Sequence, residues 1–139
     1  MRTLNKNRTY FGSVPESATR LYTAMMFDEN NTPRPALGTQ SLVVTIYNKH
    51  DGEIINNREA QNVLNANGGT LDASGNFAFT FNAEDTALQD QTLPYENRIA
   101  LFEWTYPAGA SGDDIKYGRH EIEMQVRNLT KVLDEELVP

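Results

Sequence analysis

Three phenylalanines at alternate positions constrain the fold of this chain most strongly. Phe77, Phe79 and Phe81 alternate with the small or polar residues Ala78 and Thr80. Successive side chains of a β-strand point to opposite faces, so this spacing gathers all three rings on one face. The segment therefore predicts a strand with one face buried in a hydrophobic core.

Four other segments carry similar signals. Residues 41–48 and 119–129 alternate apolar and polar side chains, which predicts strands with one buried face. Residues 20–27 and 98–106 are apolar on both sides, which predicts strands that are covered twice. In the two alternating segments we expect the following residues to face the core: Leu42, Val44, Ile46, His120, Ile122, Met124 and Val126.

One segment, residues 55–69, predicts a short helix. Asn56 or Asn57 can cap its exposed N–H groups, and Glu59 sits where a capping box places a carboxylate. Gly68 suits the left-handed position that ends a helix. A narrow apolar stripe would pack this helix on a sheet: Ala60, Val63 and Leu64.

The connections contain residues typical of turns and loops. Residues 72–76 predict a hairpin turn before the phenylalanine strand. Residues 28–38 and 107–118 are rich in Asn, Pro or Gly, which predicts long loops. Six or seven short strands with one helix and no regular βαβ alternation favour a sandwich of two antiparallel sheets.

The corner Ala83-Glu84-Asp85-Thr86-Ala87 (83–87) resembles the corner before strand F of an antibody variable domain. We expect Asp85 and Thr86 to hold it through hydrogen bonds to backbone groups. The chain has no cysteine, so the disulfide of such a domain is excluded, and Trp104 lies in the F-like strand. The resemblance indicates an immunoglobulin-like corner without antibody ancestry.

Length and charge set the domain organisation. The 139 residues favour one domain, with an arm at 1–19, a sandwich at 20–130 and a tail at 131–139. Residues 1–20 have a charge of +3, which leaves −10 for the rest of a chain whose total is −7. Such an acidic body argues against nucleic-acid binding. No apolar run approaches the ~18 residues of a membrane span, so we expect no membrane partner.

Residues with catalytic or metal-binding chemistry do not form a recognisable motif. His50 lies in a polar turn and His120 on the inner side of a strand, and neither is next to a nucleophile with an orienting third group. Zinc would need Cys or His at short spacing, and the calcium-like residues Asp72, Ser74 and Asn76 lack the glycine and the bidentate glutamate. We therefore expect no enzyme activity, no cofactor and no metal.

Five segments occur in a distinctive order: DGEIINNREAQNVLNANGG (51–69), TLDASGNFAFTF (70–81), AEDTA (83–87), RIALFEWTY (98–106) and GRHEIEMQVRNL (118–129). This order resembles small immunoglobulin-like structural proteins of tailed bacteriophages, and the resemblance covers about residues 40–129. It implies a virion protein of the head, neck, tail or baseplate. Such a protein assembles in the bacterial cytoplasm, in many copies, with other virion subunits as its partners.

Contacts with neighbouring subunits would use the basic arm and exposed aromatic side chains. The interface candidates are Arg2, Lys6, Arg8, Tyr10, Phe11, Tyr95, Tyr106 and Tyr117. An alternative is a carbohydrate-binding adhesion module of a fibre or spike, in which Tyr95, Tyr106 and Tyr117 would stack on a sugar.

Overall fold

The computed structural model describes residues 8–25, 39, 41–108 and 114–129, and their regular elements are eight β-strands without a helix. The fold is all-β, as the sequence predicts. The strands are β1 (Arg8–Pro15), β2 (Arg20–Met25), β3 (Ser41–Asn48), β4 (Gln61–Asn62), β5 (Gly69–Leu71), β6 (Asn76–Phe81), β7 (Tyr95–Ala108) and β8 (Asp114–Arg127).

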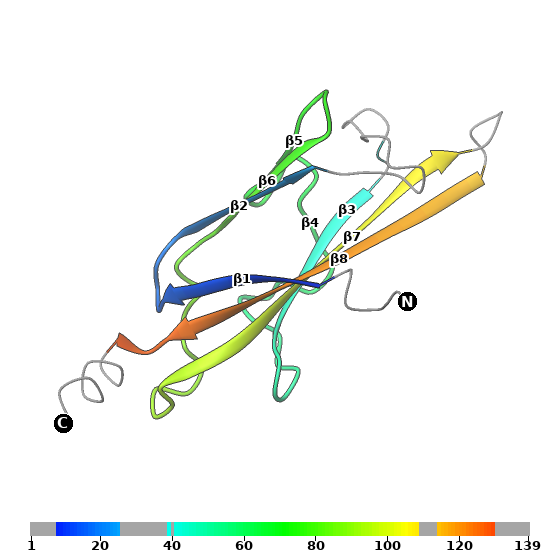
Figure 1. The fold of residues 1–139 in the computed structure, drawn as a ribbon. Helices are drawn as coiled ribbons and strands as arrows, with labels where there is room; N and C mark the ends of the chain where they lie inside the picture. The colour runs from blue at the N-terminus through cyan, green and yellow to red at the C-terminus, as the bar shows by residue number, and fades with distance from the viewer. Residues whose placement is uncertain (1–7, 26–38, 40, 109–113, 130–139) are drawn as a thin grey trace.

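The strands form two sheets (Figure 1). The larger sheet has the order β1-β8-β7-β3-β4, and the smaller one has the order β2-β6-β5. Neighbouring strands are antiparallel except β1 and β8, which run parallel. Four of the seven connections between these strands pass from one sheet to the other: β1 to β2, β2 to β3, β4 to β5 and β6 to β7.

Aromatic rings join the two sheets in the core. The ring centroid of Phe102 on β7 lies 5.9 Å from Tyr22, 5.3 Å from Phe77 and 5.5 Å from Phe79, all three in the smaller sheet. Phe79 and Phe81 are completely buried, as the spacing of the phenylalanines predicts. Burial of each ring contributes about 1.5–3 kcal/mol. The two sheets are therefore held face to face mainly by aromatic packing.

The other alternating segments also match their predictions, but β2 is not covered on both faces as predicted, because Leu21 and Met25 are 58% and 41% exposed. In β3, buried and half-buried residues alternate along the strand, with Leu42, Val44 and Ile46 in the core. In β7 both Ile99 and its neighbour Ala100 are buried, so this strand is covered on both faces at these two residues. In β8 the predicted positions face the core: Ile122, Met124 and Val126 are buried, and His120 is half-buried.

The predicted helix at 55–69 is wrong. Residues Gln61–Asn62 form β4 and pair with β3, and Gly69 begins β5. Five non-glycine residues of the segment have positive φ, which a right-handed helix does not allow: Asn56, Asn57, Ala60, Asn65 and Asn67. The asparagines are turn residues here, because Asn adopts the left-handed conformation more readily than most residues.

This segment is nevertheless fixed to the sandwich. The N–H of Ile55 donates to the carbonyl of Ile46, and the N–H of Val63 donates to the carbonyl of Leu42. The side chains of Ile55 and Val63 are completely buried. At Gly69 an added Cβ would lie 2.2 Å from the carbonyl oxygen of Val63, so only glycine fits there. Of the predicted helix stripe, Val63 and Leu64 thus pack on the core through an irregular backbone, whereas Ala60 is exposed.

Part of the predicted arm at 1–19 belongs to the larger sheet. Residues 8–15 form β1, which pairs with β8 from Arg8–Glu121 to Pro15–Arg127, with a bulge between Tyr10 and Gly12. Val14 is buried in the core. Residues 1–7 of the arm and the predicted tail at 131–139 lie outside the described residues.

β7 and β8 form a long hairpin that extends beyond its neighbours (Figure 1). Each strand has 14 residues, whereas β3 pairs only with residues 98–105 of β7. Residues 114–118, predicted as part of a loop, belong to β8 and pair with β7. Residues 28–38 and 109–113 of the predicted loops lie outside the described residues.

Candidate functional site

The corner at 83–87 is held by a buried ion pair. Arg58 donates from Nε to Oδ1 of Asp85, and their side chains are 5% and 0% exposed. The same Oδ1 accepts a hydrogen bond of 3.0 Å from Asn56, and Oδ2 accepts one of 2.8 Å from the backbone N–H of Asn82. Asp85 therefore organises the corner, as predicted, but its main partner is a side chain that the sequence did not reveal.

A second buried ion pair lies beside this corner. The guanidinium of Arg98 donates from Nη2 to Glu96 and from Nη1 to the carbonyl of Asp85 at 2.9 Å. Glu96 also accepts the backbone N–H groups of Gln89 at 3.0 Å and Asp90 at 2.9 Å. Burial lowers the pKa of Arg98, and the charge of Glu96 opposes that effect. Arg98 and Glu96 already form an ion pair and hydrogen bonds within the protein, so they are poor candidates for binding a substrate or reacting with it.

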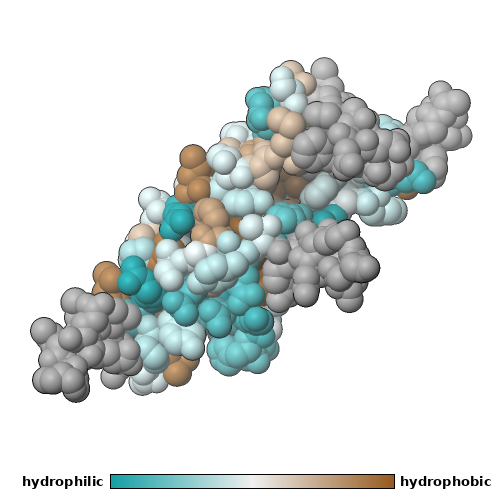
Figure 2. Space-filling model, viewed as in Figure 1, coloured by the Kyte–Doolittle hydropathy of each residue, from teal (hydrophilic) through white to brown (hydrophobic). Residues whose placement is uncertain are grey.

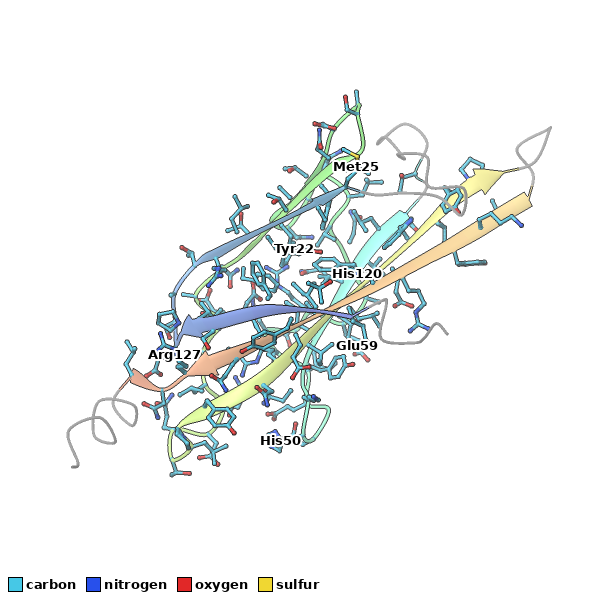
Figure 3. The ribbon with its side chains drawn as sticks, viewed as in Figure 1. Tyr22, Met25, His50, Glu59, His120 and Arg127 are labelled. Atoms are coloured by element: carbon cyan, nitrogen blue, oxygen red, sulfur yellow. The ribbon has the colours of Figure 1, made fainter. Side chains whose placement is uncertain are left out.

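The two histidines lie apart (Figure 3). His50 is exposed in the turn after β3, where its Nε2 lies 3.3 Å from Oδ2 of Asp51. His120 is half-buried, and its ring stacks on Tyr22 with centroids 6.4 Å apart. Within the described residues, no three His, Asp or Glu side chains form a group that could hold a metal ion.

His120 gives a pH-dependent prediction. Burial lowers the pKa of His120, and the charge of Glu121 partly opposes this shift. The unfolded chain, in which histidine has a pKa of about 6.5, then binds the proton more readily than the folded one. The contribution of His120 to stability is therefore full above about pH 6.5 and declines as the pH falls toward the folded pKa.

The variant His120→Gln removes this titration. Urea unfolding between about pH 7 and pH 5 should show a shallower decline in the free energy of unfolding for the variant than for the parent chain. If the free energy of unfolding declined equally in the two proteins, His120 would not contribute to the pH dependence of stability.

The predicted interface residues have different surroundings. Arg2 and Lys6 lie outside the described residues, and only the backbone of Arg8 is described. Phe11 packs against the core, with its ring 5.2 Å from that of Tyr22 in an edge-on contact. Tyr106 is buried, with 3% of it exposed, so it is not available to a partner at the surface.

Three predicted tyrosines are exposed, and they lie far apart. Tyr10 is 61% exposed, Tyr95 46% and Tyr117 75%. Tyr117 pairs with Thr105, ten residues along β7 from Tyr95, which is about 33 Å at a rise of ~3.3 Å per residue. The structure therefore does not bring Tyr95, Tyr106 and Tyr117 together into a single sugar-stacking site.

The solvent side of the larger sheet carries Tyr10 and Tyr117. We call this side the outer face, and it also contains Val43, Thr45, Tyr47, Leu101, Glu103, Arg119, Glu121 and Glu123. Their positions follow from the strand register, because their neighbours along each strand point into the core. The aliphatic side chains of Val43 and Leu101 thus alternate with charged ones on the central strands of the outer face, since Leu101 pairs with Glu121 and Glu103 pairs with Arg119.

Polar contacts fix the charged side chains of the outer face. Tyr47 donates to Glu121 at 3.2 Å, and Lys49 forms an ion pair with Glu123 at 3.1 Å. Nε of Arg119 lies 3.2 Å from Oε2 of Glu103. The outer face is therefore an ordered surface in which several acidic groups have partners.

An aromatic crevice opens near the end of the sandwich at His120. Its volume is about 420 Å³, and among the described residues it is lined by Tyr22, Phe77, Phe102 and Trp104. The indole of Trp104 lies so close to Gly118 that an added Cβ there would be 2.2 Å from a ring carbon. Its Nε1 is buried without a hydrogen-bond partner in the described part of the chain. Sequence periodicity assigned these rings to the core and did not indicate a crevice.

Neither protein-family models, nor curated proteins, nor solved structures match this chain. The function must therefore be inferred from the strands and side chains described above. In that part of the chain, no helix has the length and apolar character that a membrane crossing requires.

Proposed function

We propose that this chain is a non-enzymatic assembly protein that binds neighbouring protein subunits through the outer face. The observation that carries this proposal is the exposure of Tyr10 and Tyr117 on one ordered sheet surface. Tyrosine is enriched at protein interfaces, because its ring supplies apolar contact area and its hydroxyl supplies a hydrogen bond. In contrast, the buried charged side chains at the corner, Arg58 and Asp85, form an ion pair with each other.

The distribution of apolar side chains fits such an interface. On the side shown in Figure 2, hydrophobic residues form small separate patches among hydrophilic ones. Contacts between separately folded subunits are more polar than the permanent interfaces of obligate dimers. The partner we propose is therefore a folded neighbour that contacts tyrosine rings and partly paired charges.

An immunoglobulin-like architecture is part of the proposal. If β2 to β8 are assigned the letters B, C, C′, D, E, F and G, the sheets become B-E-D and C′-C-F-G. This arrangement is the one found in variable-type immunoglobulin sandwiches. β1 joins the edge of the G-like strand β8 in parallel.

The biological setting that we propose is the virion of a tailed bacteriophage. It rests on the resemblance of residues 40–129 to structural proteins of such particles, together with the lack of cysteine in the chain. The bacterial cytoplasm is reducing, so proteins that assemble there rarely form disulfides. Many copies of the chain would then contact other subunits of the head, neck, tail or baseplate.

The double variant Tyr10→Ser, Tyr117→Ser tests the outer face. We expect the number of copies bound to purified particles to fall at least about tenfold, because two exposed interface rings are lost. Quantitative mass spectrometry of the particles measures this number. Circular dichroism should show an unchanged fold, since neither ring is buried.

Leu21→Ser is the matched control for this experiment. Leu21 is 58% exposed and lies on β2 of the smaller sheet, so its loss should not change the particle content. Equal incorporation of the tyrosine variant and the parent chain would contradict the use of the outer face. Absence of the parent chain from all particles would contradict the virion setting.

A further inference from the structure

A polar pocket lies beside the buried corner, on the side of the irregular segment 55–69. It has a volume of about 330 Å³ and is lined by Asn56, Arg58, Gln61, Asn67, Thr80 and Asn82. We call it the amide pocket. Four of these six side chains end in an amide, and one ends in a hydroxyl. The pocket contains none of the tyrosines that the sequence suggested for binding.

Arg58 supplies a charged donor to this pocket. Its side chain is only 5% exposed, and its ring contact with Phe79, 5.0 Å from the centroid, fixes the guanidinium. Nε donates to Asp85, and Nη1 donates to Gln61 at 2.6 Å and to the carbonyl of Asn67 at 3.0 Å. Nη2 makes no hydrogen bond within the described residues, although Arg58 lines the pocket. Nη2 is not one of the buried atoms that lack a partner among the described residues, so solvent reaches it, and an acceptor of a ligand can take the place of water there.

The amide groups supply both donors and acceptors. Gln61 uses its Oε1 to accept from Arg58, so its Nε2 can donate to a ligand. Asn56 uses its Nδ2 to donate to Asp85, and Asn67 uses its Nδ2 to donate to the carbonyl of Asn62. The Oδ1 atoms of these two asparagines can therefore accept from a ligand. A suitable ligand must offer donors and acceptors close together.

The local charge is balanced. The positive charge of Arg58 is paired with Asp85, and none of the other described residues that line the pocket is ionisable. Because Asp85 neutralises the charge of Arg58, the pocket offers no net charge that would attract an anionic or a cationic ligand. The remaining lining side chains are neutral donors and acceptors, which favours a neutral ligand.

We infer that the amide pocket binds a neutral saccharide. Each sugar hydroxyl both donates and accepts a hydrogen bond, which matches the mixed groups of the pocket. A volume of about 330 Å³ lies at the lower end of the range for small-molecule sites, and it suits a small sugar unit. This inference is independent of the proposed function, because the pocket lies away from the larger sheet's outer face and belongs to another set of residues.

The backbone of the pocket is fixed before a ligand binds. Asn56 and Asn67 have left-handed φ values of 56° and 52°, and the neighbouring side chains of Ile55 and Val63 are buried in the core. The amides are therefore held in place by residues that pack inside the sandwich. Such preorganisation lowers the entropy cost of binding.

Nuclear magnetic resonance titration of the whole chain tests this inference. The probes are glucose, galactose and N-acetylglucosamine, with glucuronate as the anionic comparison. We expect at least one neutral sugar to shift the signals of the Gln61 side-chain amide and of the Gly68 and Thr80 backbone amides, with a Kd below ~10 mM. Glucuronate should bind more weakly than that sugar.

Two variants and one control locate the binding. Thr80→Val replaces a hydroxyl with a methyl group, and Gln61→Glu replaces the amide donor with a carboxylate oxygen while an acceptor for Arg58 remains; each should weaken binding about fivefold. Thr23→Val is the matched control, because Thr23 is exposed in the same sheet and does not line the amide pocket. Its Kd should equal that of the parent chain.

Three results would overturn the inference. They are the absence of shifts with every neutral sugar at ~50 mM, tighter binding of glucuronate than of the neutral sugars, and an unchanged Kd in both pocket variants. None of them bears on incorporation into particles, which the tyrosine variants test separately.

Discussion

Replacement of Asp85 by alanine is expected to lower the free energy of unfolding by about 3–5 kcal/mol. The variant leaves the guanidinium of Arg58 buried without its counter-charge. It also removes the acceptor for Asn56 and for the backbone N–H of Asn82, so the corner loses its local order. Urea unfolding followed by circular dichroism measures the effect.

Glu84→Ala is the control for Asp85→Ala, because Glu84 is the adjacent residue and is exposed. It should change the free energy of unfolding by less than about 0.5 kcal/mol. The double variant Arg58→Met, Asp85→Leu removes both charges and should restore much of the lost stability. A loss below about 1 kcal/mol in Asp85→Ala would show that the pair is not desolvated.

Glu96→Ala is expected to have an effect of similar size, a loss of about 3–5 kcal/mol. Arg98 is completely buried, and Glu96 is the carboxylate that contacts it directly. Glu96 also accepts the N–H groups of Gln89 and Asp90, which connects this strand to the preceding loop. Hydrogen exchange of these two amides should accelerate in the variant in addition to the loss of global stability.

Glu103→Ala is the matched control for Glu96→Ala. Glu103 lies on the same strand and forms an ion pair with Arg119, but the two side chains are 38% and 64% exposed. Loss of an exposed pair should cost less than about 1 kcal/mol. Equal losses in Glu96→Ala and Glu103→Ala would contradict the structural importance of the buried pair.

The strands were predictable because their signal is local. Phe77, Phe79 and Phe81 alternate with period two, and a strand is the regular structure that places such residues on one face. The same reasoning identified the core residues of β3 and β8. The ends of the β7–β8 hairpin were less predictable, because residues 114–118 combine polar side chains and glycine with strand pairing.

The segment 55–69 shows where local reasoning failed. Its apolar residues Ala60, Val63 and Leu64 have helical spacing, which favoured the helix over an irregular path. The correct signal was the asparagine content, because Asn56, Asn57, Asn65 and Asn67 all adopt left-handed conformations. Backbone contacts with β3 then stabilise a path that no helix could follow.

The buried ion pairs depend on contacts between distant parts of the chain, so the sequence did not reveal them. Arg58 and Asp85 are 27 residues apart, and no local pattern joins them. A signal was present at Arg98, a charged residue at the start of an otherwise apolar strand segment. Exposure of the predicted interface residues was also a property of the tertiary structure, since Tyr10 and Tyr106 have the same side chain and opposite environments.

The pairing of the first described strand with the last one has a consequence for biosynthesis. Residues 8–15 leave the ribosome before their parallel partner in β8, which ends at Arg127, over a hundred residues later. The larger sheet therefore cannot close until Arg127 has been synthesised, and the edge of the growing sheet stays available to other chains during that interval. Any chaperone that protects the nascent chain should bind before this last strand emerges.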